Sequence, residues 1–442
     1  MASNRSLFKL SGRAPSLQSR DFRLLWFGQL VSTMGSQMQL VAVDWHIFTL
    51  LRDETLVINL FGREIGLAGE ALGLGSLGLV RIFPIIIFAL LGGIMADTRD
   101  RRAIMLVTQC AAALFAAVLA ALTFAGRDSL AAIYLLTAAG AAAAAFDNPA
   151  RQSLVPNLVP REHMTNAVSL NTLQWQIGTI IGPAVGGVLI ASYNIGLLYA
   201  LNAISFVAVI ISLLLMRYRG RAATTSAGLG WEALIEGLRF VRSSRIIWST
   251  MLVDFFATFF ASARSMLPIV AEEVLHIGPQ GYGLLVTAQP VGAVIAGAVT
   301  ALRRDIHRQG MVLLVSVAVY GAATALFGLS TVFALSYMLF ALTGAADTVS
   351  TVIRGTVRQL MTPDHLRGRM TSVNMMFFMG GPQLGELEAG LVTALFGAPF
   401  AIFSGGIITI LLTGWVAWKY PRLRNYTSET AAQVQPANAT SG

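Results

Sequence analysis

Twelve long apolar stretches, spread along almost the whole chain, constrain what this sequence can fold into. Most hold close to the roughly 20 residues that an α-helix needs to cross a bilayer. Two of them, 130–146 and 195–216, also suit buried helices of a soluble protein, but the twelve together do not. The stretches predict an all-α polytopic membrane protein. The predicted spans are 24–50, 72–96, 104–125, 130–146, 167–192, 195–216, 246–270, 283–302, 311–329, 333–352, 372–395 and 400–418.

Charged residues are scarce in this chain. They make up 12% of its 442 residues, about half the share of a soluble globular domain, which is roughly 25%. With a single cysteine, this composition excludes a disordered chain, a disulfide-stapled secreted module and an ordinary cytosolic enzyme. A net charge of +9 suggests a nucleic-acid partner at first. The arginines lie in short clusters between apolar stretches, however, so no nucleic-acid binding is expected.

The basic residues predict the orientation of the chain. Of the 31 Lys and Arg, 26 fall on one side of the predicted alternation of spans, including Arg151, Arg354 and Arg358, which are interpreted as loop residues. By the positive-inside rule this side is cytoplasmic and holds both termini. The protein is therefore expected in a bacterial inner membrane. The expected cytoplasmic segments are the tails 1–21 and 421–442 and a linker at 217–245, with a short interfacial helix near 231–240.

The two halves of the chain repeat one another at an offset of 203 residues. Two parallel six-helix repeats are typical of secondary transporters, whose sites lie near the bilayer midplane between the halves. We therefore predict six-helix bundles at 22–216 and 246–420. The matched pairs are Arg151 and Arg354, Pro160 and Pro363, Ser169 and Ser372, Asn171 and Asn374, Gly178 and Gly381, Gly182 and Gly385, and Gly187 and Gly390.

A charged motif follows the second span, where residues 93–102 read Gly-Ile-Met-Ala-Asp-Thr-Arg-Asp-Arg-Arg. Gly93 would let helices approach closely, and Asp97 would form a cytoplasmic charge clamp with Arg101 and Arg102. Its spacing and position resemble the signature loop of the major facilitator superfamily. The resemblance implies that this loop gates the cytoplasmic side. A plain positive-inside loop is the alternative interpretation.

A second motif lies in the fifth span, where residues 178–187 read Gly-Thr-Ile-Ile-Gly-Pro-Ala-Val-Gly-Gly. It resembles the antiporter motif of exporters in that superfamily, although close helix packing alone would also explain small residues four apart. The likeness covers nearly the whole chain and is closest to the drug and siderophore exporter branch, including the enterobactin exporter group. It implies twelve helices in two pseudo-repeats and transport by alternating access. The motif residues are Gly178, Gly182, Pro183, Gly186 and Gly187.

Ionisable residues inside the spans are costly and are functional candidates. From the helical rise of about 1.5 Å per residue, Asp254 and Asp347 are predicted near each other in the cytoplasmic half. Consecutive spans usually neighbour each other, so Asp44 and Arg81 are predicted to pair in the outer half, as a titrating switch or as a permanent structural pair. Asp147 precedes Asn148-Pro149 and is interpreted as a turn or cap residue.

The eleventh span breaks the repeat with a carboxylate, because Glu386 takes the place of Pro183. Glu386 is the first candidate for proton or cation coupling. Glu388 stands about 200° away around the helix, so it would face a neighbouring helix instead. Arg264, predicted in the outer half, would set the pKa of a carboxylate or bind an anionic substrate.

Taken together, these features predict a secondary active transporter that exports a small amphipathic molecule, drug-like or siderophore-like, against proton entry. Proton-coupled uptake or facilitated diffusion is one alternative, and a non-transporting membrane sensor or scaffold is another. The sequence has no phosphate-binding Gly-Lys-Ser/Thr loop and no paired Cys/His spacing. We therefore expect no enzymatic activity, cofactor or metal, and a monomer whose partners are its substrate, protons and the lipid bilayer.

Overall fold

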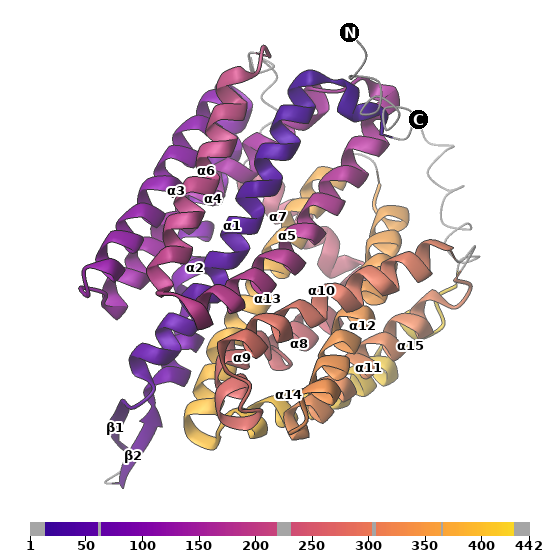
Figure 1. The fold of residues 1–442 in the computed structure, drawn as a ribbon. Coiled ribbons are helices and arrows are strands. Elements are labelled where there is room, and N and C mark those ends of the chain that lie inside the picture. The colour runs from indigo at the N-terminus through magenta and orange to yellow at the C-terminus, as the bar shows by residue number, and fades with distance from the viewer. Residues whose placement is uncertain (1–13, 61–62, 219–230, 303–305, 364–365, 428–442) are drawn as a thin grey trace. The chain divides into compact units, whose positions relative to one another are not determined.

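The computed structural model describes residues 14–60, 63–218, 231–302, 306–363 and 366–427, and this part of the chain is helical apart from one β-hairpin (Figure 1). The first half holds α1 (Arg20–Leu51), α2 (Gly69–Thr98), α3 (Arg101–Phe124), α4 (Leu130–Leu154), α5 (Met164–Ser192) and α6 (Ile195–Leu215). Short 3-10 turns lie at Pro15–Gln18, Val155–Asn157 and Arg161–His163.

The second half begins with the short helix α7 (Trp231–Ser243) and α8 (Arg245–Phe260). A 3-10 turn (Arg264–Met266), the one-turn α9 (Leu267–Ile269) and a π-helical turn (Val270–Val274) follow α8. The remaining helices are α10 (Gly278–Leu302), α11 (Gln309–Leu329), α12 (Phe333–Met361), α13 (Arg367–Phe396), α14 (Ala398–Lys419) and α15 (Pro421–Arg424).

Ten helical segments of the described chain are long and apolar enough to cross a membrane. Helices α1 and α13 have 32 and 30 residues, and they are the two further helices among the twelve predicted spans. The expected all-α polytopic membrane fold is confirmed. The expected linker helix is also present as α7, which packs against α8 and α13.

Several predicted helix ends are wrong. Helix α4 continues through Pro149 to Leu154, and α12 continues to Met361. Asp147 is therefore a helical residue rather than a turn residue. Arg151, Arg354 and Arg358 are likewise helical residues rather than loop residues. Conversely, the seventh predicted span is interrupted, because α8 ends at Phe260.

A β-hairpin that the sequence analysis did not predict connects α1 to α2. Strands β1 (Thr55–Leu60) and β2 (Arg63–Ala68) pair antiparallel, with Thr55 opposite Ala68. The backbone N–H of Gly69 donates to the carbonyl of Glu54 at 2.8 Å and closes the base of the hairpin. β2 packs against α13.

Contacts divide the chain into two compact units. Unit 1 comprises Met1–His46 and Val80–Ala227, and unit 2 comprises Ile47–Leu79 and Gly228–Gly442. The first turns of α2 thus pack with the second half of the chain. The predicted domain division at residues 217–245 stays a prediction. Some predicted segments lie outside the described chain: residues 219–230 of the linker, parts of both tails (1–13 and 428–442), and Arg303 and Arg304.

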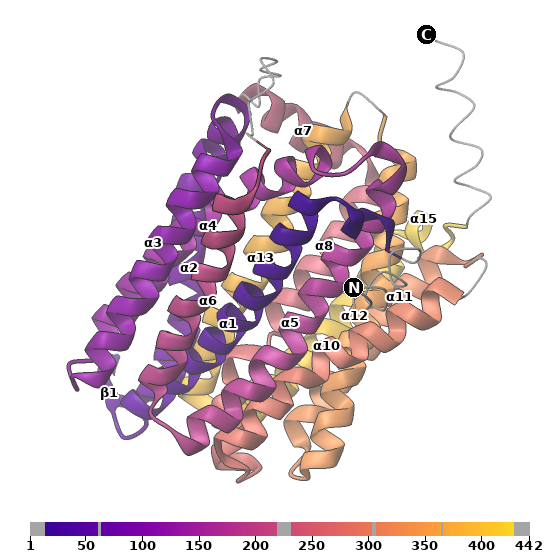
Figure 2. The same cartoon turned by 45° about the horizontal axis from the view of Figure 1, so that its top comes forward.

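Each unit has its own apolar core. In unit 1, α3 packs along both α4 and α6 (Figure 1 and Figure 2), and one core cluster includes Phe22, Met105 and Leu213. In unit 2, α11 packs against α12 and α14, and its core includes Leu313 and Val357. Polar residues of the helices are therefore held against these cores in defined orientations.

Candidate functional site

The glycines of the fifth-span motif form a close contact between α5 and α1 in unit 1. A Cβ atom added at Gly178 would lie 2.6 Å from Cγ2 of Thr33, and one added at Gly182 would lie 2.7 Å from the carbonyl of Met34. Gly186 follows along the same contact, opposite Met38. Pro183 and Gly187 are buried in the same helix. The motif thus brings the two helices together, which is the packing role considered for it.

The same contact recurs in unit 2. A Cβ atom at Gly381 would lie 2.6 Å from Oγ1 of Thr258, and one at Gly385 would lie 2.5 Å from the carbonyl of Phe259. Helix α13 therefore packs on α8 as α5 packs on α1. The internal repeat that was inferred from sequence is confirmed at the level of helix contacts.

The contact predicts the effect of a larger side chain at Gly182. We expect Gly182→Val to destabilise the protein by about 1–3 kcal/mol, because overpacking pushes the helices apart. Gly140→Val in α4 is the control, since a Cβ atom there meets nothing within 4 Å. Thermal unfolding in detergent measures both variants. Equal melting temperatures would show that the α1–α5 contact tolerates the added volume.

The glycine that allows close approach near the signature loop is Gly92 rather than Gly93. A Cβ atom at Gly92 would overlap the carbonyl of Ala145 on α4, whereas one at Gly93 meets nothing within 4 Å. The two residues differ because successive positions of a helix point about 100° apart. Asp97 is exposed at the end of α2.

The arginines of the signature loop bind helix ends. Arg101 donates from Nε to the carbonyl of Ala96 at 3.1 Å and from Nη1 to that of Ser153 at 3.3 Å. Arg102 donates from Nη2 to the carbonyl of Leu214 at 3.1 Å. These carbonyls lie in the last turns of α2, α4 and α6, where the helix dipole favours a cation. Among the described residues, both arginines thus bind helix carbonyls, and their contacts do not include the predicted clamp partner Asp97.

One charged centre of unit 1 lies toward the Leu51 end of α1. Nη2 of Arg81 is 3.2 Å from Oδ1 of Asp44, and both side chains are largely buried. The predicted ion pair is confirmed. Two residues further along, His46 contacts Oδ2 of Asp128 at 2.7 Å and the hydroxyl of Tyr199 at 3.0 Å. Two polar groups of α1 are therefore tied to α2, to the α3–α4 loop and to α6.

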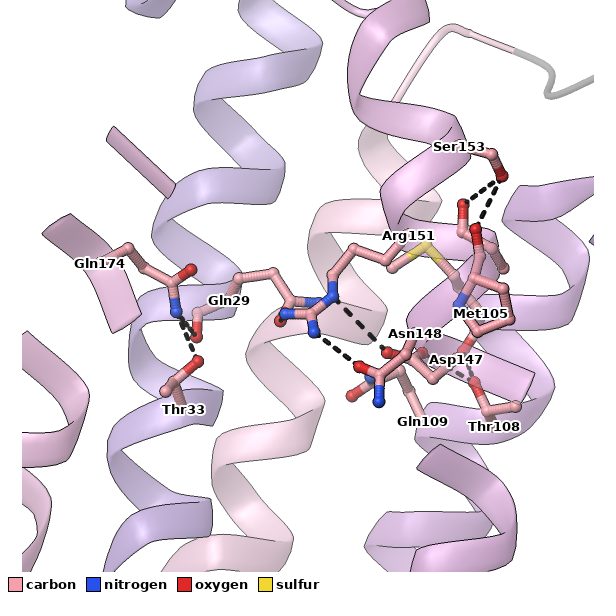
Figure 3. Close-up of polar contacts among 12 residues, drawn as sticks. Gln29, Thr33, Met105, Thr108, Gln109, Asp147, Asn148, Arg151, Ser153 and Gln174 are labelled. Carbon is pink, nitrogen blue, oxygen red and sulfur yellow. Dashed lines mark hydrogen bonds and ion pairs between the residues drawn. The ribbon is translucent and has the colours of Figure 1, made fainter. Parts of the chain in front are cut away.

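A second charged centre of unit 1 surrounds Asp147 (Figure 3). Oδ1 of Asp147 accepts hydrogen bonds from Oγ1 of Thr108 at 2.9 Å and from Nε2 of Gln109 at 3.0 Å, both on α3. Its Oδ2 lies 4.0 Å from Nε of Arg151, one turn further along α4. Asp147 is thus a buried ion-pair member.

The guanidinium of Arg151 extends between α4 and α1, as Figure 3 shows. It donates from Nη2 to Oδ1 of Asn148 at 2.8 Å and from Nη1 to Oε1 of Gln29 at 3.2 Å. Gln174 of α5 donates from Nε2 to the carbonyl of Gln29 at 3.0 Å and also bonds to Thr33. This polar network therefore joins α1, α4 and α5.

The charged centre of unit 2 surrounds Arg354 on α12. Its guanidinium forms an ion pair with Asp254 of α8 and lies 3.4 Å from Oδ1 of Asp347, with a hydrogen bond to Thr351 at 2.7 Å. The Arg354 side chain is 7% exposed and that of Asp347 is 48% exposed. The predicted closeness of Asp254 and Asp347 is confirmed, and the residue between them is an arginine that sequence analysis placed in a loop.

Arg151 and Arg354 are equivalent members of the repeat. Each donates Nη2 to the side chain three residues earlier, and each reaches the first long helix of its half. The acceptor is Gln29 on α1 in unit 1 and Asp254 on α8 in unit 2, each nine residues after the first residue of its helix. The 203-residue offset pairs Arg151 with Arg354 in the sequence. Their shared role was not predicted, because the predicted spans ended before both residues and placed them in loops.

Glu386 of α13 is buried against the first turns of α2, and Glu388 is half-buried. A Cβ atom at Gly78 would lie 3.0 Å from Cβ of Glu386, and one at Gly75 would lie 2.8 Å from Cα of Gly390. The difference in burial accords with the expected separation of the two glutamates around the helix.

Arg264 lies in the interruption after α8. The 3-10 turn that begins with Arg264 packs against α13, and the arginine is half-buried. Interrupted helices of this kind expose backbone groups and are frequent at transporter sites.

The three charged centres and Glu386 place carboxylates and guanidinium groups inside apolar helices, where they can exchange protons or bind charged solutes.

Comparisons with known proteins agree on a transporter. A family model described as transmembrane secretion effector matches residues 10–440. The enterobactin exporter EntS of Citrobacter koseri is 26% identical over 403 residues, which cover 89% of this chain and 92% of that protein. The EntS protein of Shigella boydii is 26% identical over 396 residues, covering 89% and 90%.

Solved structures share the fold at low sequence identity. A bacterial homologue of the human lysosomal transporter Spinster, in an inward-facing conformation, aligns with a TM-score of 0.70 at 12% identity over 93% of this chain and 98% of that chain. A bacterial homologue of the iron transporter ferroportin aligns with a TM-score of 0.64 at 15% identity over 91% and 98%.

Proposed function

Because the chain belongs to the transmembrane secretion effector family of the major facilitator superfamily, we propose that it is a secondary active exporter driven by proton entry. Its substrate is a small amphipathic molecule, and the two halves alternate access to it. The observation that carries this proposal is the presence of buried ion pairs in both units, at Asp44–Arg81 and around Arg354. Charges inside membrane helices are costly, and a transport role accounts for them.

The relatives support the direction of transport. The enterobactin exporters match about nine tenths of the chain, so export of a siderophore-like molecule is the first substrate class to test. The distribution of basic residues supports cytoplasmic termini in a bacterial inner membrane. Proton-coupled uptake is the second candidate, because gradients and differential affinities, rather than the fold, set the direction.

We assign proton and substrate coupling to the carboxylates and arginines of the helices. Glu386 is the first candidate, because it is buried in α13 where the equivalent residue of α5 is Pro183. Arg81 and Arg264 supply positive charges that pair with carboxylates or bind an anionic substrate, and Arg354 pairs with Asp254 and Asp347. The loop with Asp97, Arg101 and Arg102 gates the cytoplasmic side. The other candidates are Asp44, Asp254, Asp347 and Glu388.

Transport in proteoliposomes tests the proposal. With an imposed pH gradient, wild-type protein should accumulate enterobactin or another member of an amphipathic panel, and a protonophore should abolish the accumulation. The variant Glu386→Gln should lose proton-driven accumulation by about tenfold or more, a factor worth about 1.4 kcal/mol. Glu162→Gln, at an exposed position in the 3-10 turn Arg161–His163, is the control. Proton-independent accumulation by both wild type and Glu386→Gln would contradict the coupling assignment.

A further inference from the structure

Two equivalent arginines of the repeat differ in how their charges are compensated. Arg354 is 7% exposed and has two carboxylates at hand, Asp254 and Asp347. Arg151 is 26% exposed and has one, Asp147, at 4.0 Å. That carboxylate also accepts two hydrogen bonds from α3. The positive charge of Arg151 is therefore the less neutralised of the two.

The hydrogen bonds of Arg151 leave donors available. A guanidinium has five N–H groups, and among the described residues Arg151 uses two of them, toward Gln29 and Asn148. Both acceptors are neutral amide oxygens. Neutral acceptors satisfy N–H groups but do not supply the negative charge that a cation in an apolar surrounding requires.

A buried donor without a partner lies beside this guanidinium. Gln29 is 6% exposed, and while its Oε1 accepts from Arg151, its Nε2 makes no hydrogen bond to any described protein atom. Leaving such a buried amide N–H unsatisfied costs about 1–3 kcal/mol. The guanidinium of Arg151 and the unsatisfied amide N–H of Gln29 lie on two side chains that contact each other. Together they favour the binding of an oxyanion.

We propose that Arg151 and Gln29 form the binding site for a carboxylate group of the transported molecule. The planar guanidinium matches the two oxygens of a carboxylate, and the Gln29 amide adds a further donor. The assignment rests on the proposed transport function and deepens it, since it makes a small organic carboxylate the substrate class. Arg354 does not serve this purpose, because its two aspartates already supply negative charge.

Chemical modification of the purified protein in detergent tests this site. Phenylglyoxal, which reacts with accessible guanidinium groups, should modify Arg151 faster than Arg354, as peptide mass spectrometry can measure within one molecule. Salicylate at about ten times its Kd should slow the reaction of Arg151 about tenfold, because only the free protein reacts. Salicylamide, its uncharged analogue, should not protect. Equal protection by both compounds, or no faster reaction at Arg151, would overturn the proposal.

Two charge variants sharpen the test. Gln29→Glu places a carboxylate beside Arg151 and should abolish protection by salicylate, while thermal unfolding confirms that the variant is folded. Gln152→Glu adds the same charge at an exposed neighbouring position and should keep the protection. Protection that persists in Gln29→Glu would contradict the assignment. So would protection of Arg151 by nanodiscs containing phosphatidylglycerol without salicylate, which would identify a lipid phosphate as the ligand.

The outcomes separate this inference from the proposed function. If salicylate protects Arg151 but no panel compound is accumulated in proteoliposomes, the transport proposal fails while the carboxylate site stands. If accumulation is proton-driven but Arg151 is never protected, the exporter stands and the carboxylate site fails.

Discussion

Replacing Arg354 with glutamine is expected to abolish most of the folded protein. The change removes the cation between Asp254 and Asp347 and leaves the largely buried carboxylate of Asp254 without this ion pair. Breaking a buried ion pair by removing one partner costs about 3–5 kcal/mol, which is a large fraction of the stability of a typical domain. Size-exclusion chromatography of the detergent-solubilised protein and thermal unfolding measure the loss.

A second substitution distinguishes charge balance from other effects at this centre. Adding Asp254→Asn to Arg354→Gln should restore much of the folded protein, because it removes the largely buried carboxylate that the first change leaves unpaired, while the remaining Asp347 is 48% exposed. Arg358→Gln, one turn further along α12, is the matched control, since the described residues show no ion pair for it. If Arg358→Gln reduces the amount of folded protein as much as Arg354→Gln does, the proposal that the ion pairs stabilise the protein is contradicted.

The variant Asp44→Asn is expected to show the next largest loss. It removes the carboxylate 3.2 Å from the guanidinium of Arg81, and the side chains are 6% and 16% exposed. We expect a destabilisation of about 3 kcal/mol, since the charge of Arg81 loses this compensation in a largely buried position. Thermal unfolding in detergent and proton-driven accumulation in proteoliposomes measure the two consequences separately.

The double variant Asp44→Asn/Arg81→Gln decides between a titrating pair and a permanent structural pair. Removing both charges should recover most of the lost stability, because no unbalanced charge is left at the pair. If the pair takes part in coupling, this stable double variant should still lack proton-driven accumulation. Normal coupling in the double variant would show that the pair is structural.

Several features of the site were predictable from sequence. Neighbouring spans and opposite charges were sufficient to predict the Asp44–Arg81 pair, and helical rise was sufficient to place Asp254 near Asp347. These predictions needed the order of the spans and the depth of each residue, both of which follow from regular helix geometry.

Other features depended on where helices end. Pro149 and the nearby basic residues suggested that the fourth span stops near residue 146, yet α4 continues to Leu154. Because of that error, Asp147 was interpreted as a turn residue and Arg151 as a loop residue. Proline inside a helix costs a hydrogen bond, yet α4 continues past Pro149, and Ala150 and Leu154 beyond it are buried in the core of unit 1. The β-hairpin was missed because it lies in a loop between strongly apolar spans.

The sequence by itself determined the number of long helices, their approximate lengths and their arrangement in two repeats. It could do so because the free energy of placing a stretch in a bilayer is a sum over its own residues. Only the tertiary structure decided which polar groups meet. Whether Arg151 contacts Gln29, or Gly92 rather than Gly93 touches α4, depends on the rotation and crossing of packed helices. Those are set by close packing between segments far apart in the chain.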